Sequence, residues 1–261
     1  MTSRLDADLD RAALALASAR YAIALVGAGI SVESGIPPFR GAGGLWTKRG
    51  EPPMDGYQRF IADPAAGWRE MLARRGSDDE FSRALSEAVP NEAHFALARL
   101  ESIGVLRHTI SQNIDNLHFI AGSEAVTEIH GNRTKVRCID CGGRWRFDEV
   151  DLAVLPPACA QCGGVLKSDT VMFGEPIPQA ALAECQAQAE LADCMLIAGT
   201  SATVTPAAWF PQMVLERGGT LVEVNPEPTP LSDLAAASLR GPAGEVLPRL
   251  VEHVQALRRE A

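Results

Sequence analysis

The sequence has no apolar run long enough to cross a membrane and no excess of basic residues. A membrane-spanning helix needs about 20 apolar residues, and the N-terminus, MTSRLDADLDRAALALASAR, resembles an amphipathic helix rather than a signal peptide. The formal net charge is −9, which argues against a nucleic-acid binder that depends on phosphate contacts. We therefore expect a cytoplasmic protein that binds neither membranes nor nucleic acid.

Six cysteines in 261 residues are too few for a disulfide scaffold. Four of them form two CxxC pairs separated by seventeen residues, Cys138/Cys141 and Cys159/Cys162. This spacing is typical of a zinc ribbon, in which four thiolates bind the metal tetrahedrally and leave no position for a catalytic water. Two redox dithiols are the alternative. The sequence thus predicts one structural Zn²⁺ ion.

Short apolar runs of β type alternate with helical patterns along the chain. The expected strands are 21–26, 105–110, 125–129, 194–199 and 220–224, and the expected helices are 6–19, 92–102, 178–192, 206–217 and 244–258. Buried apolar strands that alternate with helices indicate a parallel sheet covered on both faces. The predicted fold class is therefore α/β, with a Rossmann-like sheet.

Two regions interrupt this alternation. Residues 41–90 contain a Gly/Pro-rich stretch and then helical patterns near 64–75 and 79–88, whereas residues 136–169 contain the paired cysteines. We expect these two insertions to form a smaller zinc-ribbon and helical domain. Residues 1–40, 91–135 and 170–261 would then form the sheet domain, with a cleft between the two domains.

A glycine-rich loop follows the first expected strand. Gly27 and Gly29 match the first two glycines of the dinucleotide motif GxGxxG, but Val32 stands at the third position, so the strict motif fails. Glycines after a strand still allow the backbone to approach a pyrophosphate. The stiff segment 36–40, IPPFR, then predicts a lid over a reactive part of a cofactor, with a packed turn as the alternative.

Polar residues follow the other expected strands where each strand ends. They are Gln112, Asn113 and Asp115, then His130, then Thr200 and Ser201 after Gly199, and finally Asn225. The carboxyl ends of parallel strands meet at one edge, where open α/β sheets bind ligands. The amides suit a carboxamide ligand such as nicotinamide, and His130 suits a general base. Ordinary turns and helix caps are the alternative.

Taken together and in this order, the motifs resemble the sirtuin family of NAD-dependent protein lysine deacylases. They are GAGISVESGIPPFRG, QNIDNLH, a strand-end HG, the paired cysteines, FGE, GTS and a late VN. The resemblance covers residues from about 20 to 250. The loop GIPPFRGAGGLW is most similar to the prokaryotic and mitochondrial branch that includes desuccinylases.

The resemblance implies that NAD is a co-substrate and that the products are free lysine, nicotinamide and O-acyl-ADP-ribose. It implies catalytic roles for His130, as general base, and for Asn113 and Arg40. Residues 30–46 would form the cofactor-binding loop. The expected NAD contacts are Gly27, Ala28, Gly29, Ile36, Phe39, Arg40, Trp46, Gln112, Asn113, Ile114, Asp115, Gly199, Thr200, Ser201, Asn225 and Ala243.

The resemblance also implies a binding segment for an acyl-lysine protein or peptide. Its members are Val171, Phe173, Gly174 and Glu175. An extended peptide that adds a strand to such a segment binds largely through main-chain hydrogen bonds, which tolerates many substrate sequences.

The acyl group is expected to lie against the helical insertion. Desuccinylases of the family use a Tyr-x-x-Arg pair for the acyl carboxylate, and alignment on Trp68 places this pair at Met71 and Arg74, with Arg75 as a rival for the arginine. An arginine can bind a carboxylate bidentately, but the tyrosine hydroxyl is missing. Met71 favours acetyl or a longer aliphatic group, so acetyl is the expected acyl group and succinyl or longer acyl groups are alternatives.

Other functions remain as alternatives. A protein mono-ADP-ribosyltransferase would use the same cleavage of NAD to modify a protein. A binding module without catalysis would not need His130 together with Asn113, Asp115 and Arg40. The broken glycine motif and the lid argue against a hydride-transfer dehydrogenase, and the acidic balance argues against a zinc-ribbon nucleic-acid binder.

Overall fold

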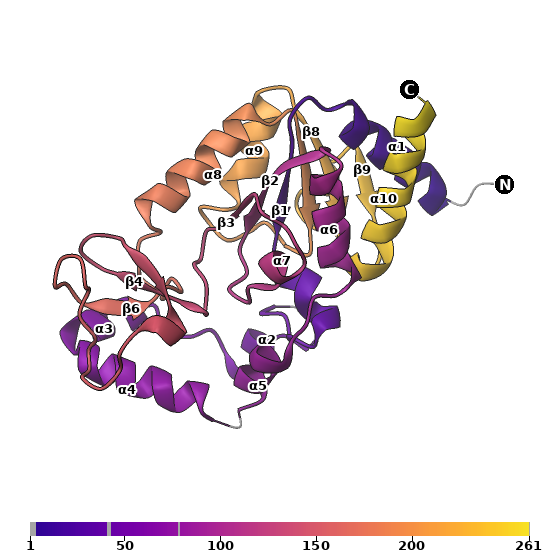
Figure 1. Cartoon of the computed structure of the whole chain (residues 1–261). Coiled ribbons are helices and arrows are strands. Elements are labelled where there is room, and N and C mark those ends of the chain that lie inside the picture. Colours follow the sequence, from indigo (N-terminus) through magenta and orange to yellow (C-terminus); the bar gives the residue numbers. More distant parts are fainter. Residues whose placement is uncertain (1–3, 41–42, 78, 261) are drawn as a thin grey trace.

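A computed structural model describes residues 4–40, 43–77 and 79–260. The chain is built around a six-stranded parallel sheet in the order β3-β2-β1-β7-β8-β9 (Figure 1). The strands are β1 (Ala22–Val26), β2 (Leu106–Ser111), β3 (Val126–Glu128), β7 (Cys194–Ala198), β8 (Thr220–Val224) and β9 (Ala237–Leu239). The chain leaves β1 for β2 on one side and later adds β7 on the other, and ligands bind at such a switch point.

Alternate residues of the central strand β1 point to opposite faces of the sheet, because side chains along a strand alternate. Ala22, Ala24 and Val26 pack toward one set of helices, and Ile23 and Leu25 pack toward another. The first set is α1 (Arg4–Ser18), α6 (Glu92–Ser102) and α10 (Ala243–Glu260), and the second is α8 (Gln179–Leu191) and α9 (Trp209–Glu216). The predicted sheet with helices on both faces is therefore confirmed.

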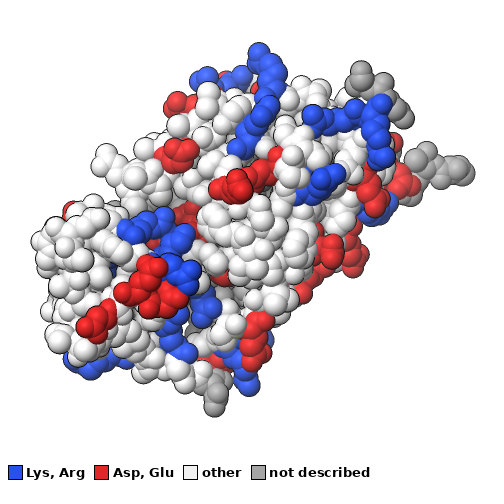
Figure 2. Space-filling view, in the orientation of Figure 1, with Lys and Arg blue, Asp and Glu red and all other residues white. Residues whose placement is uncertain are grey.

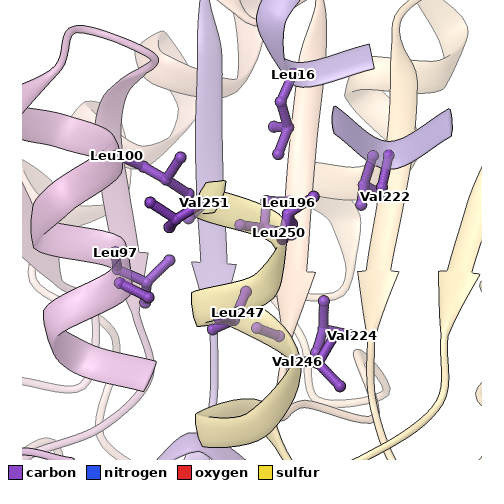
Figure 3. Close-up of a cluster of buried hydrophobic side chains, with 14 of the residues drawn as sticks. Leu16, Leu97, Leu100, Leu196, Val222, Val224, Val246, Leu247, Leu250 and Val251 are labelled. Carbon is purple, nitrogen blue, oxygen red and sulfur yellow. The ribbon is translucent and has the colours of Figure 1, made fainter. Parts of the chain in front are cut away.

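Figure 3 shows the core on the α1/α6/α10 face. Leucines from three helices meet a leucine and two valines of the sheet, and all are nearly or fully buried: Leu16, Leu97, Leu100, Leu196, Val222, Val224, Leu247 and Leu250. Each such side chain contributes about 1.5–3 kcal/mol when it leaves water. This face thus supplies a rigid base for the loops at the sheet's carboxyl edge.

A smaller unit lies beside that edge (Figure 1). It contains α2 (Leu45–Arg49), α3 (Gly56–Ala62), α4 (Pro64–Arg75), α5 (Glu80–Glu87) and an antiparallel sheet of β4 (Lys135–Cys138), β5 (Arg144–Arg146) and β6 (Leu166–Ser168). Phe60 and Trp68 share a core with Val136 and Leu166, and the Trp68 indole N–H donates to the Leu166 carbonyl at 2.6 Å. Two segments distant in sequence are thereby packed together.

The structure differs from the expected elements in several places. Strand β9, the single turn of helix α7 (Leu117–Ile120) and the short helices α2 and α3 were not predicted, because runs of three to seven residues carry too little periodicity. Helix α9 begins at Trp209, later than expected. Across the described ranges, no helix combines the length and apolarity that a membrane span requires.

Candidate active site and zinc site

The loop after β1 packs directly against the loop after β7. The Gly27 N–H donates to the Ala198 carbonyl at 3.2 Å, and the Gly29 N–H donates to the Gly199 carbonyl at 2.7 Å. A Cβ added at Gly29 would lie 2.6 Å from the Gly199 Cα, and one at Gly27 would lie 2.7 Å from the Thr200 Cβ. The two glycines are therefore required by this contact between loops, in addition to any approach of a phosphate.

A buried hydrogen-bond cluster joins this loop to the segment after β2. Ser31 lies in the 3₁₀ helix η1 (Ala28–Ser34), and its hydroxyl donates to Asp115 Oδ2 at 2.7 Å. The Asn113 amide donates to the Ser31 hydroxyl and to the Gly27 carbonyl, both at 3.1 Å. Asn113 and Asp115 are each only 7% exposed. The sequence predicted both residues at this site but missed Ser31, whose only signal was its place next to the glycine motif.

The ends of β2, β7 and β8 meet beside the glycine loop. The Gln112 amide donates to the Val26 carbonyl at 3.1 Å and to the Thr200 hydroxyl at 3.0 Å. The Asn225 amide donates to the Thr200 carbonyl at 2.9 Å. Gly199 has φ +60°, and a Cβ there would overlap the Ile30 nitrogen. Three strand ends that the sequence placed together are thus linked through Thr200.

The remaining expected cofactor residues surround this edge. Ile36 is buried, and the exposed Ser201 hydroxyl lies 2.9 Å from the Thr203 hydroxyl. Ala243 is the first residue of α10, and the next N–H, of Gly244, donates to Glu33 Oε2 at 2.6 Å. The N-terminus of α10 is therefore occupied by a protein carboxylate, which suits its partial positive charge.

His130 follows β3 and faces the segment after β2. Its Nδ1 lies 2.9 Å from the Gln112 carbonyl oxygen. A carbonyl only accepts, so Nδ1 carries the proton and Nε2 carries the lone pair of the neutral ring. Burial lowers the pKa of His130, and the hydrogen bond to Gln112 opposes this in part. The ring is therefore neutral at pH 7, with Nε2 ready to accept a proton.

The turn that holds His130 admits only glycine at the next position. Gly131 has φ +74°, and a Cβ there would overlap the main-chain oxygen of Asp169. The Asn132 N–H donates to Asp169 Oδ2 at 2.8 Å, and the His130 carbonyl accepts from the Val171 N–H at 2.8 Å. His130 is thus attached directly to the segment expected to bind the substrate peptide.

A pair of buried histidines lies behind the Ser31 cluster. The rings of His94 and His118 are 5.2 Å apart, and His94 Nε2 lies 3.5 Å from the Ser31 hydroxyl oxygen. His94 also accepts the Asn91 N–H through Nδ1, as part of a capping box on α6. Among the described residues, neither ring nitrogen of His118 has a hydrogen-bond partner. The place of His94 beside Ser31 was not expected from the sequence.

Burial controls the protonation of both rings. It lowers the pKa of His94 to about 4, with the Asp115 charge opposing the shift. Burial, together with the neighbouring His94, lowers the pKa of His118 to about 3. Both imidazoles are therefore neutral in the folded protein at pH 5 and above.

The histidine pair is expected to make the fold sensitive to mild acid. In the unfolded chain both rings titrate near the ordinary pKa of about 6.5, so below that pH the unfolded chain binds more protons than the folded one. The two histidines therefore leave the free energy of unfolding undiminished above about pH 6.5 and lower it as the pH drops toward 4. At pH 5 the two rings together lower the free energy of unfolding by roughly 4 kcal/mol.

Urea unfolding at pH 7 and pH 5 measures this effect. His118→Phe should remove about half of the histidine contribution, roughly 2 kcal/mol between the two pH values. An unaltered pH dependence in the His118 variant would contradict the assignment.

The four predicted metal ligands converge at the tip of the small unit. The sulfur atoms of Cys138, Cys141, Cys159 and Cys162 all lie within 4.8 Å of one another. The Cys138–Cys162 and Cys141–Cys159 separations are 3.5 and 3.7 Å. Zinc with Zn–S bonds of about 2.3 Å places tetrahedral sulfurs about 3.8 Å apart. The donor set therefore fits a closed, structural Zn²⁺ site.

Each cysteine pair lies on the same kind of turn. The Gly142 N–H donates to the Cys138 carbonyl at 3.1 Å, and the Gly163 N–H donates to the Cys159 carbonyl at 2.8 Å. Both glycines have positive φ, 73° and 78°, a conformation that glycine adopts without strain. The Gly that follows each second cysteine thus shapes the metal-binding turns.

The side chain of Glu175 holds the expected peptide-binding segment 171–175 in its conformation. Glu175 lies within ion pairs, with Lys167 Nζ at 3.0 Å and Arg137 Nη2 at 2.5 Å. Its carboxylate also accepts the Met172 N–H at 2.8 Å. Phe173 and Gly174 form a turn, and Gly174 has φ +77°. The Glu175 side chain therefore shapes the segment from inside, a position that the sequence alone did not indicate.

A cavity of about 650 Å³ separates α4 and α5 from the edge of the large sheet. Its lining is Met71, Arg74, Arg75, Ser77, Asp79, Phe81, Ser82, Leu85, Ile114, Arg133, Ser168 and Thr170. Ile114 lies between Asn113 and Asp115, so the cavity adjoins the polar cluster. It contains both residues of the expected acyl pocket, Met71 and Arg74.

The three arginines of the cavity differ in their contacts. Arg74 pairs with Glu70 at 2.5 Å, and its side chain is 75% exposed. Arg75 donates to the Arg133 carbonyl at 2.7 Å and lies over the Phe147 ring at 4.0 Å. Burial lowers the pKa of Arg133, and the charge of Arg75 lowers it further. Two like charges thus lie near each other at this wall, and the sequence had pointed to Arg74 or Arg75 but not to Arg133.

Aromatic rings connect the cofactor loop with the cavity and the peptide segment. Phe39 lies 5.2 Å from Trp46 and 6.3 Å from Phe81, which lines the cavity. Trp46 in turn lies 5.7 Å from Phe173. Phe39 thus contacts one residue of the cavity wall, Phe81, and its role as a lid stays a prediction.

Arg40 contacts two nearby residues, Trp46 and Glu51. Its Nη2 lies 3.1 Å from Glu51, and its guanidinium lies 4.4 Å from the centre of the Trp46 ring. These contacts do not test a catalytic role of Arg40, which stays a prediction. Residues 41–42 of the expected cofactor loop lie outside the described residues.

Acidic and basic side chains are interspersed over the face shown in Figure 2. Several of them pair on the small unit, for example Arg146 with Asp148 at 2.5 Å. Such exposed pairs contribute little to stability. Charges of both signs therefore lie close together on this face.

Known proteins are similar to this chain in sequence. The family model described as the Sir2 family matches residues 27–206. The chain is 42% identical over 240 residues to NAD-dependent protein deacylase 2 of Pyrobaculum aerophilum, with 92% of this chain and 93% of that protein covered. It is 45% identical over 254 residues to the NAD-dependent protein deacylase of Thermococcus kodakarensis, with 95% and 96% covered.

Solved structures are similar to this chain in both fold and sequence. A Sir2 homologue in complex with NAD is 41% identical, with a TM-score of 0.77 and with 94% of this chain and 93% of that chain covered. A Sir2 protein with a deacetylated p53 peptide and 3′-O-acetyl ADP-ribose is 33% identical, with a TM-score of 0.75 and 96% and 98% covered. Sir2Af2 bound to a myristoylated histone peptide is 32% identical, with a TM-score of 0.70 and 98% and 100% covered.

Proposed function

The chain belongs to the Sir2 family, the sirtuins, and we propose on this basis that it removes acyl groups from protein lysines in an NAD-dependent reaction. Its relatives are named for this activity. The observation that carries the proposal is the neutral His130, with its free Nε2 at the same sheet edge as Asn113 and Asp115. Glycines, amides and a general base thus meet where a dinucleotide binds in open α/β sheets.

The contacts at this edge support a placement of NAD. When bound, NAD supplies a ribose carbon that can lose nicotinamide and ribose hydroxyls that receive the acyl group. We place its phosphates at residues 27–29 and 199–201, and its adenosine half near Asn225 and Ala243. The nicotinamide half then faces Asn113 and Asp115, and Phe39 excludes water from it. The sheet domain would be residues 1–40, 91–135 and 170–261, with the small domain closing the cleft.

His130 is assigned the proton transfer. Its Nε2 accepts a proton from a ribose hydroxyl, which makes that oxygen a better nucleophile. Its Nδ1–H stays bonded to the Gln112 carbonyl, whose partial negative charge stabilises the imidazolium that forms. The main-chain bond from Val171 to the His130 carbonyl keeps the base next to the bound peptide.

The acyl group is assigned to the cavity beside Ile114. Met71 supports acetyl as the preferred group, but an acetyl group occupies only a small part of about 650 Å³. A second candidate is an acyl chain that ends in a carboxylate. The observation that favours it is that Arg75 and Arg133 both line the cavity and are joined by the hydrogen bond from Arg75 to the Arg133 carbonyl, so that one carboxylate can accept hydrogen bonds from two guanidinium groups.

Nicotinamide release from matched acetyl-, succinyl- and long-acyl-lysine peptides tests both proposals. We expect NAD-dependent turnover of the acetyl peptide and formation of O-acetyl-ADP-ribose, identified by mass spectrometry. If succinyl binds at the paired arginines, Arg133→Gln should lower kcat/KM for the succinyl peptide by roughly tenfold or more and leave acetyl turnover unchanged. Arg74→Gln tests the arginine expected from the sequence, and a selective loss of succinyl turnover there instead would assign the carboxylate to Arg74.

Other outcomes point to other functions. Absence of turnover with every peptide, together with transfer of label from NAD to protein, would indicate a protein mono-ADP-ribosyltransferase. Equal loss of acetyl and succinyl turnover in the Arg133 variant would contradict a carboxylate site there.

The cellular location is also inferred. Four cysteines that bind a metal as thiolates need a reducing compartment. We infer that the enzyme acts in the cytoplasm on acyl-lysine proteins.

A further inference from the structure

Glu223 is a fully buried carboxylate in β8, a strand that is otherwise largely apolar. It pairs across the sheet with Ile197 of β7 and Ser238 of β9. A buried charge is costly unless donors surround it. Its presence two residues before Asn225, an expected cofactor residue, therefore requires an explanation.

Four donors surround this carboxylate. The Ser232 hydroxyl donates at 2.7 Å, the Ser238 hydroxyl at 2.6 Å and Arg240 Nη1 at 3.0 Å, and the Thr229 hydroxyl donates to the other oxygen. All four come from the stretch that follows β8. An ionised carboxylate accepts about four hydrogen bonds, so Glu223 is saturated by residues of a single segment.

Arg240 extends this arrangement to Asn225. Its Nη1 donates to the Glu227 carbonyl at 3.0 Å and lies 3.4 Å from the Asn225 carbonyl, and its Nη2 donates to Ser232 at 2.7 Å. The Asn225 N–H donates to the Leu239 carbonyl. Asn225 is therefore held at its N–H by the end of β9 and at its carbonyl by the Glu223–Arg240 pair, while its amide reaches the Thr200 carbonyl.

We infer that Glu223 is a positioning residue for the adenosine half of the NAD site, an inference that rests on the proposed function for the location of NAD. Glu223 does not contact the ligand. It holds Arg240 and the segment 225–240 so that Asn225 meets the loop at Thr200. The nicotinamide half, at Asn113 and His130, is held by separate contacts that do not include this pair.

Glu223→Gln tests the inference, because it keeps the shape of the side chain and removes its charge. We expect KM for NAD to rise roughly tenfold, as expected for a lost charge-assisted contact. At saturating NAD, kcat and the KM for the acyl peptide should stay within about twofold. Titration with ADP-ribose should show the same roughly tenfold loss of affinity, and this readout does not require turnover.

Matched variants separate positioning from general destabilisation. Arg240→Gln should reproduce the loss, whereas Arg240→Lys, which keeps the cation, should recover most of the affinity. Arg249→Gln breaks the Arg249–Asp6 ion pair between α10 and α1, at 2.8 Å, and should change no binding constant. If Glu223→Gln fails to fold, the ADP-ribose affinities of the two Arg240 variants still test the inference.

The inference is overturned if a folded Glu223→Gln protein binds ADP-ribose as tightly as the wild type. Equal ADP-ribose affinities of Arg240→Gln and Arg240→Lys would also overturn it, as would a fall in kcat that matches the rise in KM. Wild-type protein that binds ADP-ribose but turns over no acyl peptide would count against the proposed function alone.

Discussion

Replacement of His130 by alanine is expected to lower kcat by roughly a hundredfold to ten-thousandfold, the usual contribution of a general base. The affinity for ADP-ribose and the urea midpoint should change little, because the ring is only half-buried and bonds to the main chain through one nitrogen. Steady-state formation of O-acyl-ADP-ribose measures the loss of turnover, whereas ADP-ribose titration and urea unfolding measure the affinity and the stability. Near-normal turnover in a folded His130→Ala protein would exclude His130 as the base.

The pH dependence of the wild type gives a second measurement of the same role. The base must be neutral, and burial lowers the pKa of His130. Activity is therefore expected to be constant above the ordinary histidine pKa of about 6.5 and to fall only below it. The profile is best measured with the His118→Phe protein alongside, so that acid unfolding is distinguished from protonation of the base.

Removal of zinc is expected to unfold the ribbon and to abolish turnover. Structural zinc contributes about 10–16 kcal/mol of apparent binding free energy in small zinc-binding peptides, far more than the small core around Trp68 is expected to replace. The loss reaches the active site because Arg144 of β5 pairs with Asp169, whose carboxylate accepts the Asn132 N–H beside His130. The turn that holds the base therefore depends on the ribbon.

Chelation, metal analysis and circular dichroism test this expectation. We expect one zinc ion per chain, and Cys141→Ser should lose both the metal and the activity. Cys185 is a buried thiol in α8, remote in the fold from the four ligands. Cys185→Ala should keep the zinc stoichiometry. A zinc-free protein with normal unfolding and turnover would show that the ribbon is dispensable.

Much of the fold was predictable because its signals are local. Runs such as 21–26 are buried on both faces and flanked by helical patterns, which indicates a central parallel strand. Strand β9 was missed because Ala237–Leu239 is too short to show a pattern and pairs only through the sheet. The zinc ligands were predictable because both turns are encoded by adjacent residues.

The site was predictable where its residues follow strands, and less so where they meet across the fold. Asn113 and His130 were found from their places at strand ends. Ser31 and His94 were not, because their contact links η1 to α6 and leaves no local pattern. The buried position of the Glu175 side chain was also not predictable, because it depends on ion pairs with Lys167 and Arg137, and lysine and arginine are far more often exposed than buried.

The position of β1 at the centre of the sheet has a consequence for how the protein is made. Its two neighbours are β2 and β7, and Ala22 pairs with Cys194 as well as with Leu106. When β1 and β2 have emerged from the ribosome, β7 has not yet been synthesised. The nascent chain therefore exposes the edge of the apolar strand β1 that later pairs with β7. Unpaired edges of this kind favour aggregation. We expect shielding of the growing chain to matter most until β7 has emerged.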